Sequence, residues 1–242
     1  MNNNIRPYIV LNNVSSRSIQ GLLISELPPI SKPQQRTQIE NIDGRDGDIV
    51  TPLGFAAYDK TVKISLTYDY DIDDIISFFN SEGKVIFSND PEKYYKYAIY
   101  NQIDFDKLIR FKKASVVFHV QPFKFSDTEA EKTFTFASGS SKSLTIRNNG
   151  NIYSRPTITI TGSGNINLDI NGAQILALSL LTNQTIVIDA AAMNATSEDG
   201  STLLNRRVTG DYDKIILKSG SNTISFTGSV SKISINNYSR WI

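Results

Sequence analysis

The chain has 242 residues, enough to bury two hydrophobic cores, so we start from two domains. Its 25 basic and 24 acidic residues nearly cancel, so no overall field draws it to nucleic acid or to a membrane surface. The absence of cysteine excludes a disulfide framework, thiolate zinc sites and cysteine nucleophiles.

The N-terminal segment MNNNIRPYIVLNN contains a proline, and its apolar stretch is too short for the hydrophobic core of a signal peptide. No apolar run in the chain approaches the length of a membrane span. We therefore expect a soluble protein that is made and folded in the cytoplasm.

The first distinctive region runs from about residue 25 to residue 48. Its first part, SELPPISKPQQRTQ, is proline-rich and predicts an extended, arm-like segment. Its second part contains ENIDGRDGD at residues 40–48, which is rich in aspartate and glycine. Such a loop could hold a divalent cation, carry a catalytic carboxylate pair or turn the chain.

A turn is the interpretation that the sequence favours for this loop. Asp43, Asp46 and Asp48 surround Arg45, so local neutralisation and glycine flexibility account for the composition. A phosphate-binding loop requires a helix after its glycines. The next segment here, IVTPLGF, contains proline and has no helical period.

Alternation of polar and apolar residues dominates the chain and predicts a β-rich protein. In the strand expected at residues 61–68, one face carries the apolar side chains of Val62, Ile64, Leu66 and Tyr68. Further strands are expected at residues 84–88, 94–100 and 114–121.

One segment, DIDDIISFFNSEGK, breaks this alternation and predicts a helix at about residues 72–82, the only substantial helix that we expect. Asp71 or Asp73 would cap its first turn, and Gly83 would follow its last turn. Its apolar residues recur at helical spacing, at Ile72, Ile75, Ile76 and Phe79.

The same region imitates a calcium-binding loop, because Asp69, Asp71 and Asp73 fall at alternate positions. An EF-hand requires glycine at the sixth position and glutamate at the twelfth, where this chain has Asp74 and Asn80. Helix capping explains the aspartates without a cation. We therefore expect no metal and no cofactor.

The one histidine, His119, alternates with Phe118 and Val120 and so lies on the opposite face of its strand. A structural or interface role fits this position better than catalysis, because no second histidine or cysteine can complete a site. A glycosidase would require two convergent carboxylates, and nothing in the sequence favours such a pair. We expect no catalytic residue.

The spacing of the expected strands and the composition of the turns change near residue 127. Short strands then follow one another with turns such as TGSGN and KSGSN, and Asn171-Gly172 is a strong two-residue hairpin signal. This pattern predicts a β-sandwich. We place the boundary in SDTEAEKT, which gives an N-terminal domain at residues 1–130 and a C-terminal domain at residues 131–242.

Aromatic residues of the C-terminal half leave a second function open, because exposed aromatics on a sandwich can stack on sugar rings. More often such residues belong to a core or an interface. The candidates for glycan stacking are Tyr212, Tyr238 and Trp241.

Several stretches together resemble the distal tail proteins (Dit family) of long, non-contractile-tailed bacteriophages. In the N-terminal half they are IDGRDGDI (42–49), the VKISLTYD strand, the short helix and FHVQPFKF (118–125). In the C-terminal half they are RNNGNIYSRPTITITGSGNINLDING (147–172) and LKSGSNTISFTGSVSKISINNYSRWI (217–242). The family's turn has a proline next to the glycine, where this chain has Ile42-Asp43.

The resemblance implies a mainly β structural protein of the virion. Six copies would form a ring at the distal end of the tail and join the tail tube to hub, fibre or receptor-binding proteins. The N-terminal domain would build the ring with its arm, and the C-terminal domain would be a galectin-like or carbohydrate-module-like sandwich. Candidate ring contacts are Pro28, Pro29, Pro33, Gly44, Arg45, Asp46 and Gly47.

The resemblance also sets limits on the partners. It implies no specific nucleic-acid binding beyond the passage of DNA through the ring, and no insertion into a membrane. A carbohydrate-binding baseplate module that grips cell-wall glycans is the alternative function. The sequence leaves open whether the C-terminal domain holds sugar or receptor-binding proteins.

Overall fold

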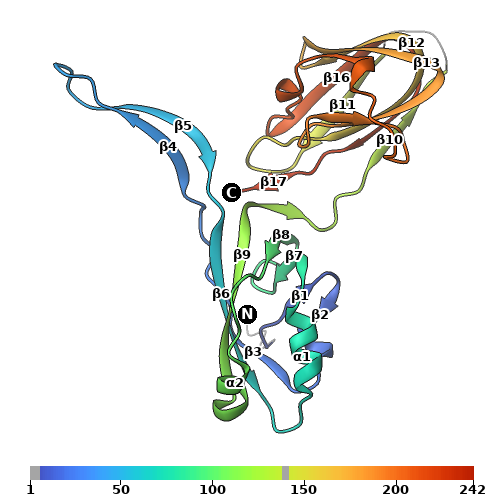
Figure 1. Cartoon of the computed structure of the whole chain (residues 1–242). Helices are drawn as coiled ribbons and strands as arrows, with labels where there is room; N and C mark the ends of the chain where they lie inside the picture. The colour runs from blue at the N-terminus through green and yellow to red at the C-terminus, as the bar shows by residue number, and fades with distance from the viewer. Residues whose placement is uncertain (1–5, 138–141) are drawn as a thin grey trace. The chain divides into compact units, whose positions relative to one another are not determined.

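The computed structural model describes residues 6–137 and 142–242, and the chain divides into two compact units. Unit 1 runs to Asp127 and also takes in Ile242, and unit 2 comprises Thr128–Trp241. Both units are built mainly of antiparallel strands (Figure 1). The prediction of a mainly β protein is therefore confirmed.

Unit 1 contains a main sheet with the strand order β2-β1-β7-β8-β9-β6-β3. These strands are β1 (Ile9–Leu11), β2 (Val14–Ser15), β3 (Leu22–Glu26), β6 (Tyr58–Leu66), β7 (Glu82–Phe87), β8 (Lys93–Ala98) and β9 (Lys113–Ser126). A separate two-stranded sheet pairs β4 (Gln35–Glu40) with β5 (Ile49–Phe55). The helical segments are α1 (Ile72–Phe79), α2 (Phe105–Phe111) and the 3₁₀ turn η1 (Ser16–Ser18).

The core of unit 1 lies on one face of the main sheet, because β6 and β9 alternate buried apolar residues with outward-facing ones. Val62 of β6 lies opposite Val116 of β9, and both are fully buried. Helix α1 packs on this face through Phe79, whose ring centroid lies 6.5 Å from that of Phe118. Each such buried side chain stabilises the fold by about 1.5–3 kcal/mol relative to exposure.

Helix α1 begins as predicted and ends differently. Asp71 caps it by accepting hydrogen bonds from the backbone N–H groups of Asp73 and Asp74. The prediction for Ile76 was wrong: it is 37% exposed, and Phe78 takes its place in the core. The prediction for Gly83 was also wrong, because Asn80 is the C-cap and Gly83 lies within β7.

Two further sequence expectations for unit 1 need correction. Tyr68 is fully exposed, because β6 ends at Leu66 and the chain leaves the sheet before reaching it. Helix α2 was not expected at all. It is only 7 residues long, so its apolar repeat is too short to stand out from the surrounding strands.

Unit 2 contains one extended sheet with the order β10-β16-β12-β13-β14. In addition, β11 pairs with β16 and β15 pairs with β13. The strands of this sheet are β10 (Lys132–Thr135), β11 (Lys142–Asn148), β12 (Thr157–Ile170), β13 (Ala173–Asp189), β14 (Asn194–Thr196), β15 (Val208–Gly210) and β16 (Gly220–Asn236). The short strand β17 (Arg240–Trp241) follows β16 and is not part of this sheet. Two 3₁₀ turns, η2 (Asn205–Arg207) and η3 (Tyr212–Lys214), follow β14.

The three long strands of unit 2 each contribute to two layers. The first half of β12 pairs with the second halves of β13 and β16, and its second half pairs with their first halves. Register shifts near Gly162 mark the bend between the halves. A Cβ atom at Gly162 would lie 2.5 Å from the Ser229 carbonyl oxygen, so the close approach of β12 and β16 at this bend requires glycine. Both halves bury side chains in one core, which makes unit 2 a sandwich.

The hairpin predicted at Asn171-Gly172 is present between β12 and β13. Ile170 pairs with Ala173, and both turn residues have positive φ angles, +53° and +82°. These angles belong to a tight two-residue turn, for which Asn-Gly is a preferred sequence.

Candidate assembly surface

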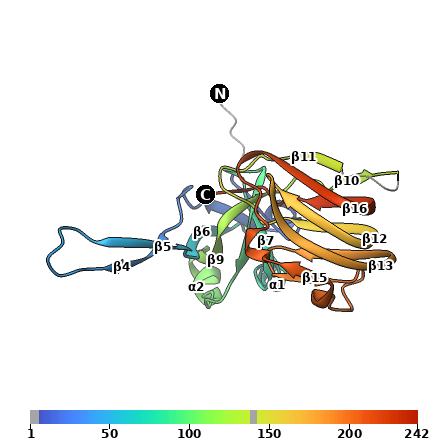
Figure 2. The same ribbon diagram turned by 90° about the horizontal axis from the view of Figure 1, so that it is seen from above.

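The segment of unit 1 that contributes least to its core is the β4–β5 hairpin, residues 35–55, which we call the arm. Gln35 pairs with Phe55 at its base and Glu40 pairs with Ile49 at its far end, where residues 41–48 form the loop. Every residue of β4 and of the loop is exposed. In Figures 1 and 2 the hairpin extends away from the rest of unit 1.

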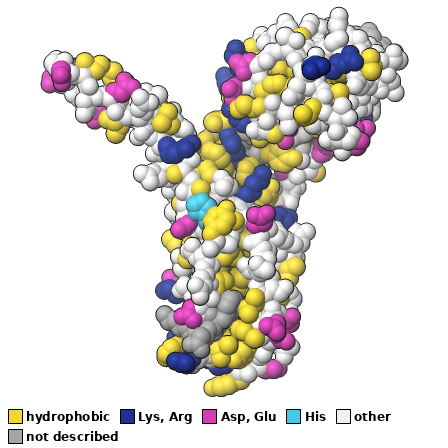
Figure 3. All heavy atoms as spheres, in the orientation of Figure 1, with side chains coloured by type: hydrophobic (Ala, Val, Ile, Leu, Met, Phe, Trp, Pro, Cys, Tyr) yellow, Lys and Arg dark blue, Asp and Glu magenta, His cyan; other side chains and the backbone are white. Residues whose placement is uncertain are grey.

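The two faces of the arm differ in composition, and we call the one with Ile39 and Val50 the apolar face and the other the polar face. Ile39 lies opposite Val50, and these side chains are 59% and 54% exposed. Pro52 follows on the same face. The other face carries Gln38, Glu40 and Thr51, and Ile49 opposite Glu40 is its apolar member. Figure 3 shows apolar side chains on the surface of the arm. Because a lone two-stranded hairpin is only marginally stable in water, this face predicts a partner that covers it.

The loop of the arm is a turn, as the sequence analysis favoured. Gly44 and Gly47 have φ angles of +82° and +79°, and the Arg45 N–H donates to the Ile42 carbonyl oxygen at 3.1 Å. Arg45 forms no ion pair with any carboxylate in the described part of the chain, so local neutralisation is not what stabilises the loop. Two arginines against four carboxylates leave the arm with a net charge of −2.

The structure places the arm at residues 35–55 rather than at 25–48. Residues up to Glu26 form β3, and the proline-rich segment 28–33 lies on unit 1. Pro28 and Pro33 are buried, whereas Pro29 is exposed. Among the expected contact residues, Pro28 and Pro33 are thus already covered by the chain itself. We call residues 28–33 the strap.

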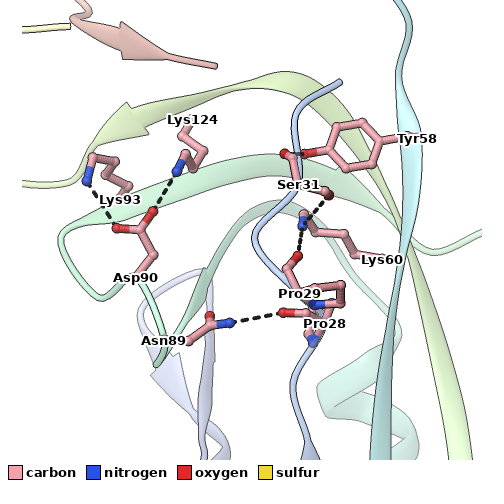
Figure 4. Close-up of polar contacts among 9 residues, drawn as sticks. All are labelled: Pro28, Pro29, Ser31, Tyr58, Lys60, Asn89, Asp90, Lys93 and Lys124. Atoms are coloured by element: carbon pink, nitrogen blue, oxygen red, sulfur yellow. Dashed lines mark hydrogen bonds and ion pairs between the residues drawn. The ribbon is translucent and has the colours of Figure 1, made fainter. Parts of the chain in front are cut away.

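Polar contacts hold the strap on unit 1 (Figure 4). Asn89 Nδ2 donates to the Pro28 carbonyl oxygen at 2.9 Å, and Lys60 Nζ donates to that of Pro29 at 2.8 Å. Tyr58 Oη donates to the Ser31 carbonyl oxygen at 3.3 Å. Lys60 is only 4% exposed, and burial together with nearby Lys124 lowers the pKa of its ammonium group to about 8.

An ion-pair cluster lies beside the strap. Asp90 accepts from Lys124 at 2.8 Å and from Lys93 at 3.1 Å. Desolvation would raise the pKa of the Asp90 carboxyl group, but hydrogen bonds and charge attraction from the two lysines outweigh it and lower the pKa. The cluster leaves Lys60 without a carboxylate partner among the described residues.

Sequence reasoning missed β5 and Lys60. The signal for β5 was present, because QRTQIE and IVTPLGF flank a glycine-rich turn, but the proline of IVTPLGF was considered only as evidence against a helix. Proline is tolerated on strands that lack a neighbour on one side, as here. Lys60 gave no signal, since nothing in the sequence marks a lysine that will be buried.

The residues considered for glycan stacking lie in different parts of unit 2. Tyr212 lies in η3, packs against the core of unit 2, and its Oη donates to Asn205 Oδ1 at 3.4 Å. Tyr238 is 39% exposed and follows β16, and Trp241 is half-buried in β17.

His119 lies on the outward face of β9, as predicted. Its Nδ1 lies 2.8 Å from Asp59 Oδ1 of β6, and with Tyr94 and Tyr100 it lines a shallow groove of about 500 Å³. Across residues 6–137 and 142–242, no three histidine or carboxylate side chains are grouped so that they could hold a metal ion. No helix of these residues is long and apolar enough to cross a membrane.

Comparison with known proteins finds no matching family model and no matching curated protein. Among solved structures, the chain is similar to SPP1 Dit (gp 19.1), described as a paradigm of the hub adsorption apparatus in phages that infect Gram-positive bacteria. The identity is 14% and the TM-score 0.68, over 95% of this chain and 98% of that chain.

Two structures of the phage p2 baseplate in its activated conformation, one with Ca and one with Sr, also align with the chain. Each is 10% identical over 96% of this chain and 97% of the other, with TM-scores of 0.47 and 0.48, too low to support an argument. The similarity to SPP1 Dit extends through both units. Over nearly its whole length, the chain therefore has the fold of a phage distal tail (Dit) protein.

Proposed function

We propose that the chain is a structural protein at the distal end of a bacteriophage tail, with no catalytic role. In this proposal six copies form a ring that joins the tail tube to hub, fibre or receptor-binding proteins. The observation that carries the proposal is the similarity to SPP1 Dit along the full length of both chains.

The exposed arm is the structural feature that favours the proposed ring. A ring of identical subunits is assembled head to tail, so each subunit presents two different complementary surfaces. The apolar face at Ile39 and Val50 suits one of these surfaces, because it is exposed in the single chain and would be covered by a neighbouring subunit. Gly44, Arg45, Asp46 and Gly47 at the exposed loop are then the residues best placed to reach furthest onto that neighbour.

The ring is tested by measuring mass in solution over a range of protein concentrations and imaging the sample for rings. We compare two double variants of the same hairpin. Ile39→Ser with Val50→Ser changes the apolar face, and Gln38→Ser with Thr51→Ser changes the polar face. The apolar-face variant should raise the concentration needed for assembly by about tenfold or more, the polar-face variant by less than about threefold.

Effects below about threefold for both double variants would remove the arm from the interface. A second measurement tests the location independently of ring stability. An antibody against unit 2 should label the distal end of purified tails of the phage that encodes the chain. Labelling along the tail, or on the capsid only, would overturn the proposed location.

A further inference from the structure

The arm has two connections to the rest of unit 1. On one side β5 continues through Ala56 and Ala57 into β6, a strand of the main sheet. The ring of Phe55 also packs edge-on against Phe123 of β9, with centroids 5.5 Å apart. On the other side, β4 is connected to β3 only through the strap. The Ala56 N–H donates to the Gln34 carbonyl oxygen at 2.8 Å and closes the base of the hairpin.

If the strap were free, the arm would be held only by the β5–β6 connection and the Phe55–Phe123 ring contact, and it could pivot about Ala56 and Ala57. The strap has no regular secondary structure, and its prolines lack backbone N–H groups, so it cannot be fixed by pairing along its length. Its attachment depends on the burial of Pro28 and Pro33 and on the few groups of unit 1 that reach its carbonyl oxygens.

Among those groups, Lys60 is the most deeply placed. Its Nζ contacts the strap at two points, the Pro29 carbonyl oxygen at 2.8 Å and Ser31 Oγ at 3.4 Å. It lies 5.2 Å from the ring centroids of both Tyr58 and Tyr95, which adds cation–π attraction. A buried ammonium group without a carboxylate partner is costly, and the strap carbonyl is its main hydrogen-bond acceptor.

We propose that Lys60 is a positioning residue for the arm: by binding the strap it gives the arm a second fixed connection to unit 1. Removing the ammonium group should loosen the strap while leaving the main sheet folded, because an apolar side chain of similar length can fill the same space. The inference concerns the single chain and does not depend on the proposed ring.

The test uses the native absence of cysteine, which allows clean labelling at two engineered positions. Spin labels at Lys32→Cys in the strap and Ser77→Cys on α1, both exposed, report the distance between the strap and the core of unit 1. Lys60→Met is compared with Lys63→Met. Lys63 lies three residues further along β6, is exposed and is paired with Glu26 at 2.6 Å.

We expect Lys60→Met to broaden the distance distribution by about twofold or more, and Lys63→Met to leave its width unchanged. A distribution in Lys60→Met as narrow as in the parent protein would overturn the proposal. If Lys60→Met does not fold, a measurement on the unsubstituted chain tests the proposal instead, by comparing the chemical accessibility of Lys60 and Lys63. Acetylation followed by mass spectrometry should modify Lys60 at least tenfold more slowly than Lys63, and equal rates would also overturn it.

Discussion

The chain contains two antiparallel hairpins whose surroundings are opposite. The β12–β13 hairpin turns in two residues and buries Ile158, Ile160 and Ile166 completely in the core of unit 2. The arm turns in an eight-residue loop and buries almost nothing. Backbone pairing is common to both hairpins, so side-chain burial accounts for the difference in stability that we expect. In the proposed ring, the side-chain burial that the arm lacks in the single chain would come from a neighbouring copy.

The largest effect that separates the two hairpins should come from deleting buried side-chain atoms. Ile160→Ala should lower the free energy of unfolding of unit 2 by about 2–5 kcal/mol, through lost burial and the cavity that remains. Calorimetry of the full chain measures this loss as a lower unfolding temperature of unit 2. A loss below about 1 kcal/mol would show that unit 2 is not held together by this core.

The next effect concerns Lys60, which binds the strap that leads into the arm. Lys60 has a pKa of about 8 in the folded chain, below the ordinary lysine value of 10.5, so above pH 8 the unfolded chain binds more protons and stability rises with pH. Between pH 8 and 9.5 the wild type should gain about 2 kcal/mol relative to Lys60→Met.

The comparison of Lys60→Met with the wild type cancels the ionisation of groups that lie far from Lys60. Calorimetric unfolding of unit 1 at a series of pH values measures the difference. A gap between the two proteins that stays constant with pH would mean that Lys60 titrates normally.

A smaller effect separates the two turns. Gly172 and Gly44 both have φ of +82°, with no atom within 4 Å of an added Cβ. Gly172→Ala should destabilise unit 2 by about 1 kcal/mol or more, because its turn is coupled to the buried strands. Gly44→Ala should leave the unfolding transition of unit 1 unchanged, because the arm can relax independently. Equal losses would mean that the arm unfolds together with the core.

The smallest effect is expected for the apolar face of the arm in the single chain. Val50→Ser should change the free energy of unfolding by less than about 0.5 kcal/mol, as for most exposed positions. Urea unfolding at a concentration where the chain is monomeric measures this change. A loss above about 1 kcal/mol would indicate that Val50 is covered by unit 1 itself.

Prediction from the sequence succeeded where the local pattern determines the structure. The strand around Val62 and Ile64, the cap at Asp71 and the turn at Asn171-Gly172 each depend on a few neighbouring residues. The fold as a whole was reached through the family resemblance, since short motifs spread over both halves resemble the Dit proteins.

Prediction failed where distant residues decide. Gly83 looks like the end of a helix, yet it lies in β7, where an added Cβ would lie 2.2 Å from Asn12 Oδ1, a residue far away in sequence. Pro28 and Pro33 look like part of a free arm, yet both are buried, and residues from β6, β7, β8 and the turn after β7 lie around Pro28. Lys60 binds the strap only because the fold brings Pro29, which is distant in sequence, within hydrogen-bond distance.

The central claim is that the arm gains its order from a neighbouring copy of the chain, whereas the β12–β13 hairpin is ordered by its own core. Hydrogen exchange followed by mass spectrometry, on the monomer and on assembled rings or tails, tests this directly. Arm amides should exchange within seconds in the monomer and at least about 100-fold more slowly after assembly, while β12–β13 amides stay protected in both. Arm amides that are already protected in the monomer, or that exchange equally fast after assembly, would contradict the claim.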